Sequence, residues 1–142
     1  MSSPRAALAG AAAALVWGAL EPIDKRVFRN DYSDVALLGK FVTRKRAWPV
    51  AGFALHAVNG AAFGLAFAEV RRRTSAPPLR LAVGLALAEH VALYPLSYVV
   101  DRKHPARGEP GVRNVWSPRG FAQATARHAL FGAMLGRLAD ER

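Results

Sequence analysis

The stretch LRLAVGLALAEHVALYPLSYVV, residues 79–100, has the length and composition of a single membrane crossing. A helix needs about 20 mainly apolar residues to cross the hydrocarbon core of a bilayer. The apolar residues of this stretch lie on every side of a helix, as lipid contact requires, instead of along one stripe. Helix is the expected state because a backbone in lipid must satisfy its own hydrogen bonds. The stretch therefore predicts a transmembrane helix.

The chain contains three more apolar segments of similar length, at residues 6–23, 49–70 and 121–139. Of its 142 residues, 52% are hydrophobic, which is enough apolar material for one domain and excludes a disordered protein. No cysteine is present, which excludes disulfides and thiolate chemistry. We predict an all-α fold, an integral membrane four-helix bundle with one domain over residues 1–142. A soluble bundle of apolar helices is one alternative, and a signal peptide at the first segment is another.

Two motifs recur in the second half of the chain. WGALEPIDKRVFR, from Trp17, aligns with HVALYPLSYVVDR, from His90, at an offset of 73 residues. A pattern of one histidine and two glycines at four-residue spacing recurs at an offset of 72 residues, as His56, Gly60 and Gly64 and then as His128, Gly132 and Gly136. We therefore predict two tandem helix-hairpin repeats, over residues 6–70 and 79–139.

The four-residue spacing places each histidine and its glycines on one helix face, as close packing of small residues requires. If the two halves are repeats, these faces are expected to meet near a pseudo-two-fold axis. His56 and His128 would then lie close enough to hydrogen-bond, share a proton or hold a ligand. Packing is the first explanation for the glycines, and the role of the histidines stays open.

Basic residues outnumber acidic ones by 20 to 10, and they gather between the apolar segments. We expect the basic loops to contact the lipid bilayer at its anionic headgroups, and we expect no nucleic acid because no base-reading motif occurs. The segment SDVALLGKFVTRKR, from Ser33, is interpreted as a plain polar connector, with a short interfacial helix as the alternative. A homo-oligomer or a membrane partner could use the small-residue faces.

Polar residues within apolar segments are candidates for function because they are expensive to place in a membrane. This polar intramembrane cluster is predicted to comprise Glu21, His56, Asn59, Glu89, His90, Tyr94, Arg127 and His128. Arg127 is expected to neutralise Glu21 or Glu89, whereas Asp24 and Asp101 are expected near the membrane surface. Pro22 and Pro95 each remove an amide donor, so both helices are expected to kink.

Three functions remain open for such a polar interior. The first is permeation of protons, ions or a small solute. The second is a membrane redox protein that binds haem or a transition metal through His56, His90 or His128, although no specific metal motif occurs. The third is a non-catalytic scaffold or subunit. We predict no catalytic residues and no resident cofactor, because no nucleophile–base pair or phosphate-binding loop is present.

The combination of WGALEP in the first segment, AEHVALYPL in the third and a histidine beside small residues in the last resembles the YagU-like family of uncharacterised bacterial inner-membrane proteins. The similarity covers the helix cores and not the loops. It implies a small protein of the bacterial inner membrane, for which a part in acid tolerance has been suggested. No catalytic residues carry over from it.

Overall fold

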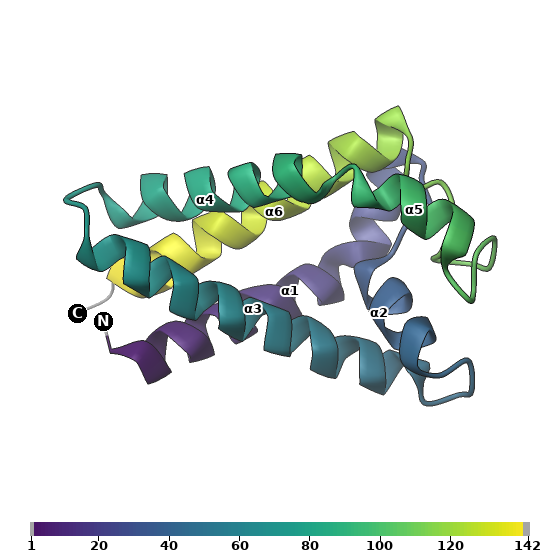
Figure 1. The fold of residues 1–142 in the computed structure, drawn as a ribbon, viewed down its shortest axis with the longest axis horizontal. Helices are drawn as coiled ribbons and strands as arrows, with labels where there is room; N and C mark the ends of the chain where they lie inside the picture. Colours follow the sequence, from purple (N-terminus) through teal and green to yellow (C-terminus); the bar gives the residue numbers. More distant parts are fainter. Residues whose placement is uncertain (1, 141–142) are drawn as a thin grey trace.

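The computed structural model describes residues 2–140, and every regular element in that part of the chain is helical. The helices are α1 (Ser3–Phe28), α2 (Asp34–Val42), α3 (Trp48–Arg72), α4 (Pro78–Leu93), α5 (Leu96–Lys103) and α6 (Pro118–Asp140). The all-α prediction is confirmed. Figure 1 shows the four long helices side by side, with both termini at one end and α2 and α5 at the other.

Two helices, α1 and α3, are long and apolar enough to cross a membrane. The bent pair α4 and α5 forms a third candidate span, with an angle of 53° between its two parts. This indicates a membrane-associated protein. α6 covers the fourth predicted segment but is not among these candidates, because polar side chains such as Gln123 and Arg127 lower its hydropathy.

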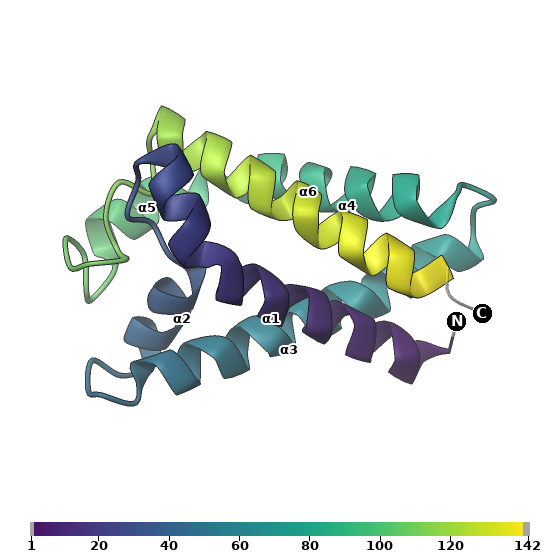
Figure 2. The same cartoon turned by 180° about the vertical axis from the view of Figure 1, so that it is seen from behind.

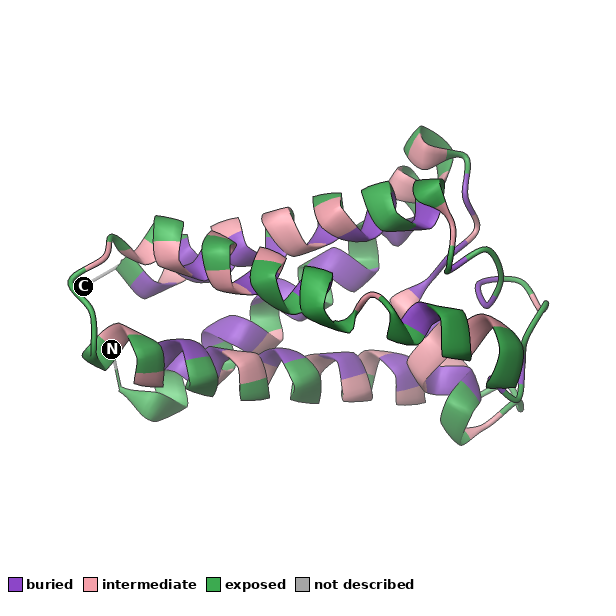
Figure 3. Cartoon of the chain, turned by 45° about the horizontal axis from the view of Figure 1, so that its top comes forward, coloured by how far each residue is buried: buried purple, intermediate pink, exposed green. Residues whose placement is uncertain are grey.

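The long helices expose large apolar side chains, while a few charged and polar side chains are buried beside an apolar core. Large apolar residues are exposed along the outside of the long helices, including Leu8 (71%), Val27 (70%) and Val50 (74%). Charged and polar side chains such as Glu21, Gln123 and Arg127 are buried. Figure 3 shows the buried faces turned inward and the exposed faces outward. Apolar side chains on the outside and polar side chains paired inside are what lipid as a solvent selects.

The long helices pack as two hairpins, α1 on α3 and α4 on α6, and α1 and α6 join them. Small residues set the distance within each hairpin. A side chain at Gly60 would collide with the Gly10 carbonyl oxygen, and one at Gly132 would lie 2.8 Å from the Ala82 carbonyl oxygen. The helices can approach this closely because neither glycine carries a Cβ.

The second glycine of each triad repeats this arrangement. A side chain at Gly64 would meet the Ala6 carbonyl oxygen, and one at Gly136 would lie 3.1 Å from the Pro78 carbonyl oxygen. The two glycine faces therefore pack inside separate hairpins. The expectation that they meet each other is wrong, because the carbonyl edges of α1 and α4 already occupy them.

The two predicted kinks differ in outcome. Pro95 ends α4 and begins the sharp turn into α5. Pro22 lies inside α1, which continues to Phe28, and Figure 2 shows that α1 changes direction in the C-terminal part that contains this proline. Both prolines leave a backbone carbonyl without its usual donor.

The connector after α1 is a helix and not the plain loop that we favoured. Ser33 caps α2, and its Oγ accepts a hydrogen bond from the amide of Ala36 at 2.9 Å. α2 packs closely on α3, because a side chain at Gly52 would collide with the Val35 carbonyl. This packing brings the start of α2 back toward the middle of the molecule.

Candidate functional site

A buried guanidinium organises the centre of the fold. Arg127, on α6, has only 2% of its side chain exposed. Its Nε and one Nη each donate to a carboxylate oxygen of Asp24 at 2.6 Å, and its other Nη donates to Asp34 at 2.8 Å. The Nη that binds Asp24 also donates to the Tyr32 carbonyl oxygen at 2.9 Å. Arg127 thereby ties α6 to α1 and to the start of α2, as a planar fork of donors allows.

A third carboxylate, that of Glu21, lies at the edge of this cluster. Its Oε1 is 3.6 Å from an Nη of Arg127 and accepts from the amides of Asp34 and Val35 at 2.7 and 3.2 Å. Its Oε2 accepts from the hydroxyl of Ser33. Glu21 therefore accepts hydrogen bonds from the first backbone amides of α2, where the positive end of the helix dipole favours a negative charge. The predicted pair with Arg127 exists, but Asp24 and Asp34 are closer partners.

Further polar side chains complete the cluster. Gln123 is fully buried, donates to Asp24 at 2.6 Å and accepts from Asn30 at 3.0 Å. The hydroxyl of Tyr32 donates to Asp34, and the Arg127 guanidinium lies 4.7 Å from the centre of the Tyr32 ring. The network therefore links α1, the segment before α2, and α6.

The charged partners of Asp34 decide its ionisation. Burial alone would raise the pKa of Asp34, but the Arg127 guanidinium, together with His56 and the hydrogen bond from Tyr32, outweighs it and holds the pKa below the ordinary value of 3.8. Burial raises the pKa of Tyr32 well above its ordinary value, so its hydroxyl keeps the proton that it donates. Asp34 is therefore an ionised carboxylate at neutral pH.

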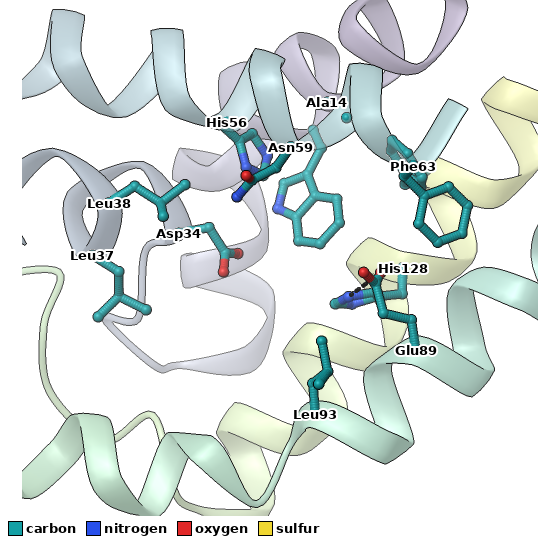
Figure 4. Close-up of a pocket in the computed structure, with 13 residues that line it drawn as sticks. Ala14, Asp34, Leu37, Leu38, His56, Asn59, Phe63, Glu89, Leu93 and His128 are labelled. Carbon is teal, nitrogen blue, oxygen red and sulfur yellow. Dashed lines mark ion pairs between the residues drawn. The ribbon is translucent and has the colours of Figure 1, made fainter. Parts of the chain in front are cut away.

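A cavity of about 220 Å³ adjoins the cluster. Its walls come from α1, α2, α3, α4 and α6, and Figure 4 shows Asp34 and His128 reaching into it from opposite sides. Its polar lining comprises Trp17, Asp34, His56, Asn59, Glu89 and His128. The cavity therefore gathers four of the eight residues predicted as a polar cluster, namely His56, Asn59, Glu89 and His128.

An aromatic stack connects the three predicted intramembrane histidines. The ring of Trp17 lies 5.0 Å from that of His56 and 4.8 Å from that of His128, both edge to face. His128 in turn stacks on His90 at 4.8 Å. The approach of His56 to His128 that we expected is therefore interrupted, because the Trp17 indole stands between them.

The hydrogen bonds of two of these histidines define their tautomers. The Nδ1–H of His128 donates to the Ala124 carbonyl oxygen at 2.8 Å, which leaves Nε2 as an acceptor, 4.0 Å from Glu89. His90 Nε2 lies 2.9 Å from the hydroxyl of Thr125, which itself donates to the Phe121 carbonyl oxygen. His90 therefore donates through Nε2. Glu89 therefore lies beside His128, with which it forms an ion pair only when that ring is protonated, and not beside Arg127.

Two buried polar atoms of the cavity wall stand apart from this network. His56 and Trp17 are only 7% and 6% exposed. Within residues 2–140, neither His56 Nε2 nor Trp17 Nε1 has a hydrogen-bond partner. A buried polar group without a partner costs about 1–3 kcal/mol. Such atoms on a cavity wall point to a ligand or to water as their partner.

The remaining predicted residues have different positions. Tyr94 lies outside the cavity, where its hydroxyl is 2.8 Å from the carbonyl oxygens of both Val115 and Ser117 and holds the segment before α6. Asn59 lies on the exposed side of the cavity wall. Asp101 accepts from the amides of Val115 and Trp116 and so secures the same segment.

The described residues give little support to a metal or haem centre. In residues 2–140, no three histidine or acidic side chains converge in a way that could hold a metal ion. The Trp17 ring lies in the space that a ligand shared by His56 and His128 would need. The Nδ1 of His128 is already used in its hydrogen bond with the Ala124 carbonyl oxygen. The three histidines thus fit an aromatic stack better than a coordination sphere.

Sequence reasoning missed the main acidic partners of Arg127. Asp24 was expected near the membrane surface, and Asp34 is not among the residues predicted for the cluster. Asp34 lies 93 residues from Arg127 in the sequence, so no local spacing links them. The available signal was the capping pattern at Ser33, which predicts where α2 begins.

Comparison of the chain with family models, with curated proteins and with solved structures finds no match. The resemblance to the YagU-like family therefore stays a prediction.

Proposed function

We propose that the chain is an integral membrane four-helix bundle of two tandem hairpins, and that its polar interior carries protons or small cations. The first unit contains α1, α2 and α3, and the second contains α4, α5 and α6. Support comes from the contacts of the glycine faces. Gly60 with Gly10 corresponds to Gly132 with Ala82, and each partner is shifted by 72 residues. A duplicated hairpin explains why both the glycines and the carbonyls that they contact recur at one offset.

α6 is the fourth span in this proposal. Its 23 residues are about 34 Å long at 1.5 Å per residue, which matches the hydrocarbon core of about 30 Å. Its polar residues, Gln123 and Arg127, are directed into the network and away from lipid. Because those side chains are satisfied inside the bundle, they do not oppose insertion of the folded protein.

The excess of carboxylates over guanidinium in the cluster and the adjoining cavity carries the functional proposal. Glu21, Asp24 and Asp34 contact the single guanidinium of Arg127, and Glu89 lines the cavity next to them. Ionised carboxylates without matching cations are unfavourable inside a membrane. The interior is therefore balanced by taking up protons or a cation, and groups that exchange protons or cations at membrane depth are the elements of a permeation path.

The histidines and the cavity extend this acidic cluster toward the other hairpin. His128 lies within 4.0 Å of Glu89 at one side of the cavity, and Asp34 lies at the other side. The cavity is far larger than the roughly 10–15 Å³ that one water needs. Water in the cavity would link them into one path.

Proton flux into liposomes tests this function. Purified protein is reconstituted with a pH-sensitive dye inside, and a pH gradient is applied with valinomycin and potassium to balance charge. Flux above that of empty liposomes, reduced by Glu89→Gln, is the expected result. Glu69→Gln is the matched control, because Glu69 pairs with Arg73 at 2.6 Å at the far end of α3 and does not line the cavity.

The proposal is wrong if the protein gives no flux of protons, sodium or potassium under any gradient. It is also wrong if flux is the same in the wild type and in Glu89→Gln and Glu21→Gln. Single cysteines introduced into the cysteine-free chain test the topology separately. Labels after α3 and at the termini should react from one side of the membrane, and labels between α2 and α3 should react from the other.

A further inference from the structure

The cavity beside the acidic cluster has the features of a binding site for a specific class of small molecule. It holds about 220 Å³, and an apolar protein cavity of about 150 Å³ already binds benzene. A ligand with one aromatic ring and a short polar chain therefore fits. The wall contains both apolar surface, from Phe63, Phe131 and Leu93, and polar groups that lack partners.

The charge of the wall selects a cation. Asp34 and Glu89 line the cavity, and its described lining includes no lysine or arginine. Within residues 2–140, the only guanidinium in contact with Asp34, that of Arg127, is shared with Asp24 and Glu21. Aromatic rings in the wall add to the attraction for a cation, and tryptophan does so most strongly. An anion would meet two carboxylates and no fixed positive charge on this surface.

The two buried atoms without hydrogen-bond partners narrow the chemical class of the ligand further. His56 Nε2 accepts a hydrogen bond when the proton is on Nδ1, so an ammonium N–H is a suitable partner. Trp17 Nε1 is a donor only and needs an acceptor, which an ammonium group lacks. One ligand satisfies both atoms if it carries an ammonium group and an oxygen.

The cavity opens between the two hairpins. α3 and α4 make few contacts, in contrast to the tight packing within each hairpin. Asn59 on α3 and Glu89 and Leu93 on α4 line the cavity and are also exposed, so the opening lies between these helices. In a membrane this opening faces lipid, which favours a ligand with an apolar part.

We propose that this cavity binds a small protonated amine that carries a hydroxyl or similar oxygen acceptor and an apolar group. The ammonium lies between Glu89 and Asp34 and donates to His56, the oxygen accepts from Trp17, and the apolar group packs on Phe63 and Leu93. The proposal rests on the membrane bundle proposed above and names the cation that its interior accepts.

Fluorescence of Trp17 gives a direct readout of binding. Full-length protein with Trp48→Phe and Trp116→Phe retains Trp17 as its single tryptophan. In detergent micelles it is titrated with phenylethanolamine, with phenylethanediol, in which a hydroxyl replaces the ammonium, and with phenylethylamine, which lacks the hydroxyl. We expect a saturable change with phenylethanolamine, and binding at least about tenfold weaker for the diol, because loss of one charged contact of about 1.4 kcal/mol changes affinity tenfold. Phenylethylamine should bind between these two.

A comparison of variants at Glu89 and Glu69 tests whether the ligand binds in this cavity. Glu89→Gln should weaken phenylethanolamine binding about tenfold and leave diol binding unchanged, because only the charged contact is lost. Glu89 is partly exposed, so its replacement does not endanger the fold. Glu69→Gln should change neither affinity.

Each other outcome has a definite meaning. Equal affinity for phenylethanolamine and the diol overturns the proposal, because the cavity would then select apolar shape and not charge. Equal weakening by Glu69→Gln and Glu89→Gln overturns it as well. No saturable binding in protein that still conducts protons overturns the amine site and leaves the proposed function standing. Amine binding without any ion flux supports the site and overturns permeation.

Discussion

Replacement of Arg127 by methionine removes the one buried cation that joins α1, α2 and α6. The guanidinium donates to Asp24 twice, to Asp34 and to the Tyr32 carbonyl oxygen, over distances of 2.6 to 2.9 Å. Methionine keeps the length and apolar character of the side chain but leaves three carboxylates without their cation. Removal of one partner from a buried ion pair lowers the free energy of unfolding by about 3–5 kcal/mol. We expect Arg127→Met to lower the free energy of unfolding by about 4 kcal/mol.

Two additional variants show whether the loss has this cause. Arg127→Lys keeps the charge but has three donors in place of five, so we expect an intermediate loss. Adding Asp24→Asn to Arg127→Met removes one of the stranded charges. The double variant should therefore be more stable than the sum of the two single losses predicts, by about 1–3 kcal/mol.

Reversible unfolding in mixed detergent micelles, followed by circular dichroism, measures these free energies. Arg137→Met is the control, because Arg137 lies on the same helix but is exposed. The reasoning is refuted if Arg127→Met and Arg137→Met differ by less than about 1 kcal/mol, the range of an exposed ion pair. Additivity of Asp24→Asn and Arg127→Met would also refute it.

Other predictions concern the hairpin contact, acid stability and the bend. Gly60→Ala should destabilise by about 1–3 kcal/mol, because its Cβ collides with the Gly10 carbonyl, whereas Gly84→Ala has nothing within 4 Å and should be neutral or slightly stabilising in the same unfolding assay. Burial would raise the pKa of Asp31, but hydrogen bonds from the Gly111 amide and the Lys25 ammonium lower it. Its contribution should be present above pH 3.8 and disappear as the pH falls through the lower folded pKa, and Asp31→Asn should remove this part of the acid titration of stability. Pro95→Ala should reduce the 53° bend between α4 and α5, measured as a longer distance between spin labels on the two helices, and an unchanged distance would assign the bend to packing.

The helical class and the apolar surface follow from composition alone. Residues 79–100 are apolar on every side, and the structure exposes Val91, Leu93 and Leu96 as lipid contact requires. The glycine spacing also predicted a close helix contact, because only small side chains allow it. These features are local, so the order of residues within one helix is enough to determine them.

The partners of the polar side chains could not be read from the sequence. Glu21 and Arg127 were recognised as buried candidates, but Asp34 joins them only because α2 folds back on α3 and delivers its first turn to the centre. Likewise, the spacing of His56 and Gly60 fixes a shared face but not which helix covers it. α1 covers it in the structure, because the small residues of α1 present a bare backbone at that level.

Helix periodicity and transfer free energy act on each segment separately, so the order of residues is enough to predict a helical protein with an apolar surface and a few polar interior positions. The shared use of one guanidinium by three carboxylates, and the place of Trp17 between His56 and His128, arise only when the helices pack. The physical reason is that ion pairs and ring contacts depend on distances of a few ångströms between helices. Those distances are set by packing across the whole fold, and no local pattern encodes them.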